Sequence, residues 1–289
     1  MSAAATSTEW DIEFLDLTAY LARVGYDGDR APTARTLRDL HLAHTAAIPF
    51  ENLDIPLGHG IRLDLAGLQD KLVHRSRGGY CYEQNLLFAA VLERLGFGVT
   101  RLLARIRNGS DKIRPRSHAT LRVEAEAEDG AGEGSVWLAD VGFGGEGLLE
   151  PIPLTAGTPA RQGGWSFRLD REDGGVWVLR SLHSGGWFDL YAFTLEAQPY
   201  ADFVVSNYFT STNPSSPFVG QAVVQRTSAD ARHSLRGRDL TVTRPDGSAD
   251  HRTLTDEEFA GLLVTTFGIA LDQADAMRAL SGIDAPPAG

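Results

Sequence analysis

The spacing of apolar residues predicts helices in the first 95 residues. Apolar positions recur every three or four residues, as they do on one face of a helix, in the segments 14–26, 33–50, 64–74 and 81–98. In the first segment this face consists of Phe14, Leu17, Tyr20 and Leu21, and in the second of Leu37, Leu40 and Ala43. The fourth segment places Leu87, Val91 and Leu95 on one face and stops at Gly96, a typical helix end. Residues 1–95 therefore form a compact helical bundle in this prediction.

The period changes to two from about Val99. Alternation of apolar and polar residues is typical of half-buried strands, and it occurs in the segments 98–107, 117–126, 135–143, 165–172 and 176–183. The turn residues Asp173, Gly174 and Gly175 separate the last two segments. Short strands at this spacing predict an antiparallel sheet or small β-barrel over residues 96–197.

The last region, residues 198–289, has a mixed pattern. Residues 197–209 could form a helix, whereas 222–228, 233–245 and 250–255 have the composition of strands. Thr255 and Glu258 fit a capping box at the start of another helix, and the tail from Asp284 is expected to be frayed. The chain is thus predicted to be an α+β protein: a helical bundle, a β-barrel and a smaller α/β region.

Composition and charge exclude some classes of protein. The 289 residues include 27 Lys and Arg against 38 Asp and Glu, a formal net charge of −11, which disfavours nucleic acid and anionic lipid as partners. The first 14 residues lack the basic start and apolar stretch of a signal peptide. The single cysteine leaves no internal disulfide and suits a reducing compartment, so we predict a cytoplasmic protein.

That cysteine, Cys81, is the first candidate for chemistry. Two glycines precede it and an amphipathic segment follows it, so the thiol is expected at a helix N-terminus, where the helix dipole favours a thiolate. Arg77 is close in sequence and adds positive potential. A buried structural cysteine is the alternative, because a lone cysteine often packs as a small apolar residue.

A nucleophilic thiol needs a base, and eight histidines are available. His41, His44 and His74 lie in predicted helices among polar neighbours and are expected to be solvated or to cap a helix. His118 begins a predicted strand and Asp140 ends an apolar one. Taken singly, the histidine can be a strand-edge residue and the aspartate a turn cap. The remaining four lie in loops or near turns: His59, His183, His233 and His251.

The glycines after Asp140 resemble a dinucleotide-binding loop without its context. Gly142, Gly144 and Gly147 match the spacing G-x-G-x-x-G, and a strand precedes them. That fingerprint requires a helix to follow, but Pro151 and Pro153 exclude one here. The glycines still allow backbone to approach a ligand closely. The sequence has no Walker motif, zinc-ligand spacing or calcium loop, so we expect no metal.

Five segments together resemble the arylamine N-acetyltransferases, in that family's order and spacing. They are IPFENLDI (48–55), RGGYCYEQN (77–85), RSHATL (116–121), WLADVGFGG (137–145) and SNYFTSTNPSSPF (206–218). The resemblance covers nearly the whole chain. It implies a helical domain, a β-barrel and an α/β domain around a cysteine-protease-like Cys-His-Asp core. Gln84 and Ala119 depart from the family pattern, but they flank the predicted chemistry.

The resemblance also implies roles for individual residues. Cys81, His118 and Asp140 match the family's catalytic triad, and the rings of Phe143 and Phe218 would line the acceptor pocket. Gly142 and Gly144 would lie along the path of coenzyme A, and Arg77 would pair with Glu83. The implied activity is acetyl transfer from acetyl-CoA, used as a substrate with no permanently bound cofactor, through a cysteine thioester to an arylamine or hydrazine. The kinetics would then be ping-pong.

Three other functions stay open at this stage. Some members of the family are amide synthases that form macrolactams from carrier-bound polyketides, although they tend to have a reduced third region. A Cys-His-Asp triad also serves thiol hydrolases. A binding module without catalysis is the third. The sequence leaves the preferred amine and the oligomeric state undetermined.

Overall fold

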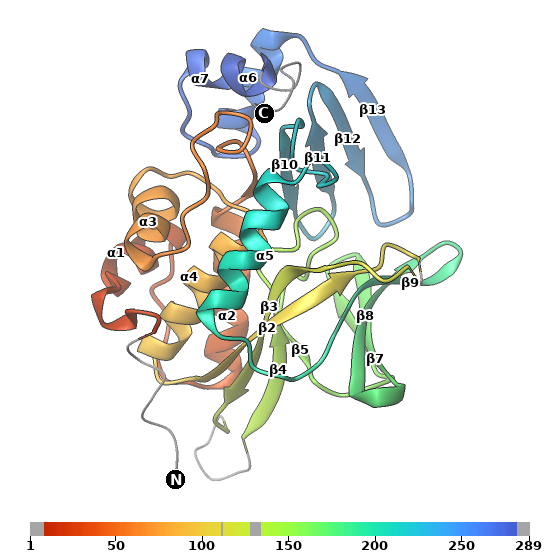
Figure 1. The fold of residues 1–289 in the computed structure, drawn as a ribbon. Coiled ribbons are helices and arrows are strands. Elements are labelled where there is room, and N and C mark those ends of the chain that lie inside the picture. The colour runs from red at the N-terminus through yellow and green to blue at the C-terminus, as the bar shows by residue number, and fades with distance from the viewer. Residues whose placement is uncertain (1–8, 111, 128–133, 282–289) are drawn as a thin grey trace.

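A computed structural model describes residues 9–110, 112–127 and 134–281 (Figure 1). The first region is helical as predicted, and its elements are α1 (Leu17–Val24), α2 (Ala34–Ala47), α3 (Leu65–Gln69), the π-helical turn η2 (Asp70–His74) and α4 (Cys81–Arg94). Side chains cap three of these helices: Asp16, Thr33 and Asp64 each accept a hydrogen bond from a backbone N–H in the first turn. The predicted frayed tail lies outside the described residues.

The helix α4 is the centre of this region. Twelve of its fourteen residues are buried, and it packs against α1, α3 and the strands β2 and β3. It ends one residue before Leu95, and Gly96 takes the left-handed conformation (φ 93°) that the predicted stop requires. Because α4 is enclosed on all sides, the position of its first residue is fixed by the surrounding core.

The second region is an antiparallel sheet of eight strands in the order β5-β4-β3-β2-β9-β8-β7-β6, which curls into a nearly closed barrel (Figure 1). The strands are β2 (Gly98–Ile106), β3 (Arg116–Ala125), β4 (Ser135–Ala139), β5 (Ile152–Pro153), β6 (Pro159–Gln162), β7 (Trp165–Glu172), β8 (Val176–His183) and β9 (Gly186–Phe193). The sequence pattern did not predict β9, which lies between β2 and β8 in the sheet and pairs with both. Its alternation is hidden because its last four residues are all buried.

The third region combines a second sheet with three helices. Its sheet has the order β1-β10-β11-β12-β13, with β1 (Phe50–Glu51), β10 (Val223–Thr227), β11 (Arg232–Arg236), β12 (Asp239–Thr243) and β13 (Ala249–Thr253). The helices are α5 (Tyr200–Thr212), α6 (Asp256–Thr265) and α7 (Gln273–Ser281), of which α7 was not predicted. The strand β1 comes from the helical region, so the segment IPFENLDI joins the first region to the third.

Two local predictions were wrong. The single strand expected over 233–245 is a hairpin, because Gly237 (φ 56°) turns the chain between β11 and β12. Phe14, expected on the apolar face of the first helix, is 73% exposed. Asp16 caps α1, so the helix begins at Leu17 and Phe14 lies in a separate 3₁₀ turn before it.

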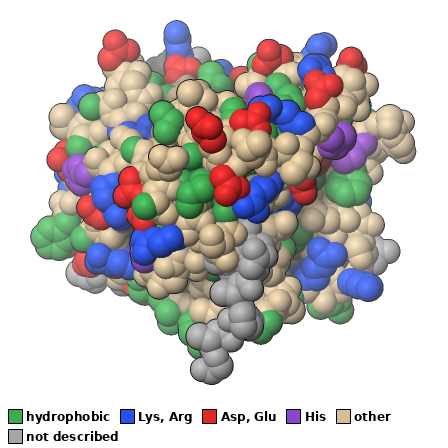
Figure 2. Space-filling model, turned by 90° about the horizontal axis from the view of Figure 1, so that it is seen from above, with side chains coloured by type: hydrophobic (Ala, Val, Ile, Leu, Met, Phe, Trp, Pro, Cys, Tyr) green, Lys and Arg blue, Asp and Glu red, His purple; other side chains and the backbone are tan. Residues whose placement is uncertain are grey.

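The surface carries both signs of charge. Acidic and basic side chains are interspersed on the face that Figure 2 shows, with apolar side chains between them. Within the described residues, no helix combines the length and the apolar composition that a membrane span needs.

Candidate active site

Cys81 is the first residue of α4, as the sequence predicted. Its side chain is 4% exposed, and Sγ lies 3.9 Å from the carbonyl oxygen of Ser117. The turn before it requires glycine at position 78, because a Cβ there would lie 2.2 Å from the carbonyl oxygen of Pro49. Glu83 accepts a hydrogen bond from the N–H of Tyr80 at 3.0 Å and fixes the helix start. The thiol therefore lies at the N-terminal end of a buried helix, where the helix dipole is positive.

His118 and Asp140 meet because β3 and β4 are neighbours in the barrel. His118 lies near the start of β3, and Asp140 directly follows β4, whose last residue Ala139 pairs with Leu121. In this register Nε2 of His118 lies 2.6 Å from Oδ2 of Asp140, and both side chains are almost fully buried. The other carboxylate oxygen accepts hydrogen bonds from Asn85 at 2.9 Å and from the N–H of Gly142 at 3.0 Å.

The electrostatics of this pair favour a charged imidazole ring. Burial lowers the pKa of His118, but the charge of Asp140, the hydrogen bond to it and the nearby Cys81 thiol raise the pKa to about 10. Burial likewise raises the pKa of Asp140, but the charge of His118 outweighs it, so the pKa lies below its usual value. At neutral pH the site therefore holds an imidazolium next to the thiol of Cys81.

Cys81 and His118 lie on the wall of a cavity of about 790 Å³. Phe143 and Phe218 also line it, and their role in an acceptor pocket stays a prediction. The ring of Phe143 packs edge-on against His118 with centroids 5.1 Å apart, and Tyr191 lies 4.7 Å from His118. The volume is within the range of roughly 300–1,000 Å³ that small-molecule sites occupy, and aromatic rings shape its walls.

The cavity wall carries more basic than acidic side chains, although the chain as a whole is acidic. Three arginines line it, Arg114, Arg232 and Arg236, against one carboxylate, Glu146. Arg232 stacks over Trp165 at 3.7 Å and pairs with Glu146 at 3.3 Å, and burial lowers its pKa to about 10. Arg114 and Arg236 are more accessible. A positive wall on a chain of net charge −11 points to an anionic ligand.

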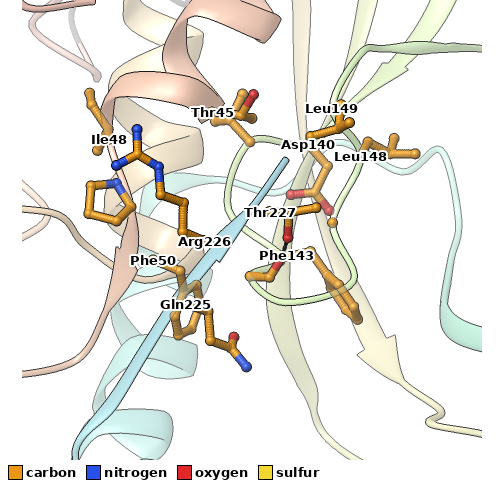
Figure 3. Close-up of a pocket in the computed structure, with 14 residues that line it drawn as sticks. Thr45, Ile48, Phe50, Asp140, Phe143, Leu148, Leu149, Gln225, Arg226 and Thr227 are labelled. Carbon is orange, nitrogen blue, oxygen red and sulfur yellow. Dashed lines mark hydrogen bonds between the residues drawn. The ribbon is translucent and has the colours of Figure 1, made fainter. Parts of the chain in front are cut away.

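The glycines of the predicted coenzyme path lie on two sides of one loop. Gly142 borders the large cavity and approaches α4 so closely that a Cβ would lie 2.8 Å from the Cα of Cys81. Gly144 (φ 88°) instead lines a small cavity of about 30 Å³ behind the loop (Figure 3). A Cβ at Gly144 would lie 2.3 Å from Oε1 of Gln225. The role of both glycines toward coenzyme A stays a prediction. No helix follows this loop, as the two prolines predicted.

A buried ionic cluster lies beneath the helix start, and it corrects the predicted pair of Arg77 and Glu83. Arg77 contacts Glu51 at 2.7 Å and Asp54 at 3.1 Å, whereas Glu83 contacts Lys71 at 2.8 Å. The sequence reasoning missed Lys71, because its place in a predicted helix gave no sign of burial. Arg77 is neutralised by its two carboxylates, so it contributes little positive potential to Cys81.

The expectation for two histidines was wrong. His41 and His44 are fully buried. His44 lies between the hydroxyl of Tyr20 at 2.8 Å and Oε1 of Gln84 at 3.3 Å, and His41 contacts the backbone on either side of the glycine loop. Asn85, which holds Asp140, was also missed. Only its place one turn after Cys81 on α4 could have suggested it.

Comparisons with known proteins identify the family. The N-acetyltransferase family model matches residues 33–276. The arylamine N-acetyltransferase of Mycolicibacterium smegmatis is 40% identical over 261 residues, which cover 89% of this chain and 93% of that protein. The chain belongs to the arylamine N-acetyltransferase family. The resemblance found in the sequence is thereby confirmed, and the family is a class of acyltransferase enzymes.

Solved structures of family members share the fold. The crystal structure of the Nocardia farcinica arylamine N-acetyltransferase superposes with a TM-score of 0.89 at 46% identity, covering 98% of this chain and 100% of that one. The Mycobacterium marinum enzyme in complex with CoA superposes with a TM-score of 0.84 at 37% identity, covering 93% and 98%. These matches confirm the predicted α+β fold with its cysteine-protease-like core. The described residues contain no group of three or more metal-ligating side chains.

Proposed function

We propose that this protein transfers the acetyl group of acetyl-CoA to arylamines or arylhydrazines through a thioester on Cys81. The observation that carries the proposal is the buried His118–Asp140 pair, whose His118 lines one cavity together with the single cysteine. Names of relatives support both substrates: they are arylamine N-acetyltransferases, and the M. marinum enzyme binds CoA.

In the first half-reaction the Cys81 thiolate attacks the carbonyl carbon of acetyl-CoA. The bond from that carbon to the coenzyme sulfur breaks, and the departing sulfur takes the proton of the His118 imidazolium. Asp140 stays ionised and holds the ring through Nε2, so the proton that moves is the one on Nδ1. Cys81 then carries the acetyl group, and His118 is neutral.

In the second half-reaction the amine enters the cavity that coenzyme A has left. Its nitrogen attacks the acetyl carbon, neutral His118 accepts a proton from that nitrogen, and the bond from carbon to the Cys81 sulfur breaks. The thiolate–imidazolium pair is restored and the amide departs. Because the two substrates use one cavity in turn, the kinetics are ping-pong. Phe143 and Phe218 contribute the aromatic wall against which the amine's ring packs.

Two alternatives are separated from this proposal by assay. A macrolactam-forming amide synthase needs room for a carrier-bound polyketide. The volume of about 790 Å³ and a third region with a five-stranded sheet and the helices α5, α6 and α7 favour small acceptors. A thiol hydrolase would cleave a peptide amide without coenzyme A. The protein should acetylate an arylhydrazine from acetyl-CoA, with parallel lines in double-reciprocal plots, and should leave the peptide amide intact. Intersecting lines would contradict the ping-pong order.

The positive wall gives a prediction about the donor. Replacing Arg236 by alanine should raise the KM for acetyl-CoA at least about tenfold, because a charge-assisted contact to a phosphate contributes about 1.5–3 kcal/mol. The KM for the amine, measured on the acetyl-enzyme, and kcat should change less than twofold. The KM for acetyl-CoA should also rise with salt in the wild type and less steeply in the variant.

The matched control is Arg35→Ala on α2. Arg35 is exposed, with a weak contact to Asp39 at 3.9 Å, and it does not line the cavity. Its removal changes the net charge equally, so any effect of overall charge appears in both variants. Equal effects on both substrates, or equal effects of the two substitutions, would show that Arg236 does not meet the coenzyme.

A further inference from the structure

The loop from Asp140 to Leu149 carries both Asp140 and Phe143. Its ends are packed, because Val141, Leu148 and Leu149 are buried in the apolar cores, whereas the stretch 143–146 between them is only half-buried. Four of its ten residues are glycine, which leaves the backbone free to move. It encloses the small cavity of about 30 Å³ together with residues of α2 and β10 (Figure 3). A cavity of this size has room for about one or two waters, so the loop lacks close-packed contacts on this side. Hydrogen bonds to the loop backbone therefore add to the apolar contacts of its ends.

One side chain bonds the backbone at both ends of this loop. His41, on α2, accepts a hydrogen bond at Nε2 from the N–H of Asp140 at 3.2 Å. Its Nδ1 lies 2.9 Å from the carbonyl oxygen of Leu149 and donates to it. Asn85 holds the first end, and Gln225 and Thr227 hold the middle. Among the described residues, His41 alone spans from one end to the other.

We propose that His41 is a positioning residue, whose neutral imidazole clamps the two ends of the loop and so fixes Asp140 against His118. The inference rests on the proposed triad. A backbone N–H needs an acceptor and a carbonyl needs a donor, so the ring has to be the neutral Nδ1–H tautomer. A proton on both nitrogens would set two donors against each other at Asp140.

The surroundings of the ring maintain that neutral form. His41 is fully buried and packs edge-on against Phe88 with centroids 5.8 Å apart. Burial lowers its pKa to about 4, although the two backbone hydrogen bonds and the charge of Asp140 act in the opposite direction. The neighbouring His44 has a pKa lowered to about 3 for the same reason. Neither ring carries charge at neutral pH, so His118 is the charged histidine of the site.

Two substitutions test the two hydrogen bonds of His41 separately. In His41→Gln the amide oxygen stands near the position of Nε2 and can still accept from Asp140. In His41→Asn the amide nitrogen stands near Nδ1 and can donate to Leu149, but the N–H of Asp140 loses its acceptor. We expect kcat to fall at least tenfold in His41→Asn and less than fivefold in His41→Gln, with the KM for acetyl-CoA within twofold in both. The larger loss is expected in His41→Asn because this variant leaves the buried N–H of Asp140 without an acceptor.

His44→Asn is the matched control. It removes a buried ring from the same helix one turn away, without touching the loop, so it should lose thermal stability like the His41 variants and keep kcat within threefold. Equal kcat in His41→Asn and His41→Gln would overturn the proposal. So would an equal loss in His44→Asn. Acetylation of Cys81 in the wild type, followed by mass spectrometry, tests the proposed function separately: its absence refutes the thioester mechanism itself.

The wild-type protein offers a test that does not depend on the activity of the variants. In a ¹⁵N-histidine spectrum at pH 7, His41 should appear as a neutral ring protonated at Nδ1, the tautomer that is less common in free histidine. His41→Gln identifies the signal by its loss. A charged ring, or a ring protonated at Nε2, contradicts the clamp even if no variant can be assayed.

Discussion

Replacing Cys81 by alanine is expected to abolish acetyl transfer, with a loss of at least about 10⁴-fold in kcat, because removing a covalent nucleophile costs up to about 10⁶-fold in comparable enzymes. Cys81→Ser should be nearly as inactive, since an alkoxide is far harder to form than a thiolate at neutral pH. Wild-type protein mixed with acetyl-CoA alone should gain one acetyl group, which peptide mass spectrometry places on Cys81.

In Cys81→Ala, a loss of catalysis can be distinguished from a loss of folding. The Cys81 side chain is small and lies at the cavity wall, so Cys81→Ala should melt within a few degrees of the wild type and still bind coenzyme A in calorimetry. The chain has no other cysteine, so thiol labelling reports on this residue alone. Substantial turnover by a Cys81→Ala protein that binds the coenzyme normally would refute the covalent mechanism.

Replacing Asp140 by asparagine should lower kcat by about 10⁴-fold, the cost of the same change in a serine-protease triad. The reason is the donors around this carboxylate. His118 donates to Oδ2, while Asn85 and the N–H of Gly142 donate to Oδ1. In either orientation the NH₂ group of an asparagine meets a donor where an acceptor is needed. The charge that holds His118 as an imidazolium is lost as well.

The pH dependence of alkylation tests the same point directly. Iodoacetamide reacts with the thiolate form of a cysteine, so the proposed ion pair with His118 should keep Cys81 reactive at pH 6, where a free thiol reacts slowly. The sign follows from His118: its pKa is raised to about 10, so the ring is charged throughout the range from pH 5 to 8. Asp140→Asn and His118→Gln should both lose the reactivity at pH 6.

Asp170→Asn is the control for loss of a structural carboxylate. Asp170 lies on β7, where it pairs with Arg168 and Arg180, and it does not line the cavity. It should melt at a lower temperature and keep kcat within twofold. If Asp140→Asn melts normally and is acetylated at a near wild-type rate, Asp140 is a turn cap and the triad assignment is wrong.

Local sequence patterns were sufficient for much of the fold. Helical periodicity and the stop at Gly96 located α4, and the glycines before Cys81 located the thiol at its N-terminus. These features depend on residues within one or two turns of each other, where the physical rules are backbone geometry and amphipathic spacing. The strand β9 was missed because it is buried on both faces near its end, which removes the alternation.

Ranking the histidines needed the tertiary structure. By local pattern His41 and His44 were expected to be solvated or to cap a helix, yet the packing of α2 against α4 and the glycine loop buries both. A polar residue at a buried helical position looks like a surface residue unless its partners are known, and the partners of His41 are about 100 residues away. Local patterns likewise did not predict the positive cavity wall, because its arginines come from two separate regions, the barrel and the third-region sheet.

The sequence by itself determined the parts: one cysteine at a helix start, a histidine and an aspartate at the ends of two strands, and segments that identify the family. The tertiary structure alone decided how the parts meet. The register of β3 against β4 brings His118 within 2.6 Å of Asp140, and the buried position of α2 gives the glycine loop a clamp. Strand register and burial arise from contacts between distant segments, which no local periodicity encodes.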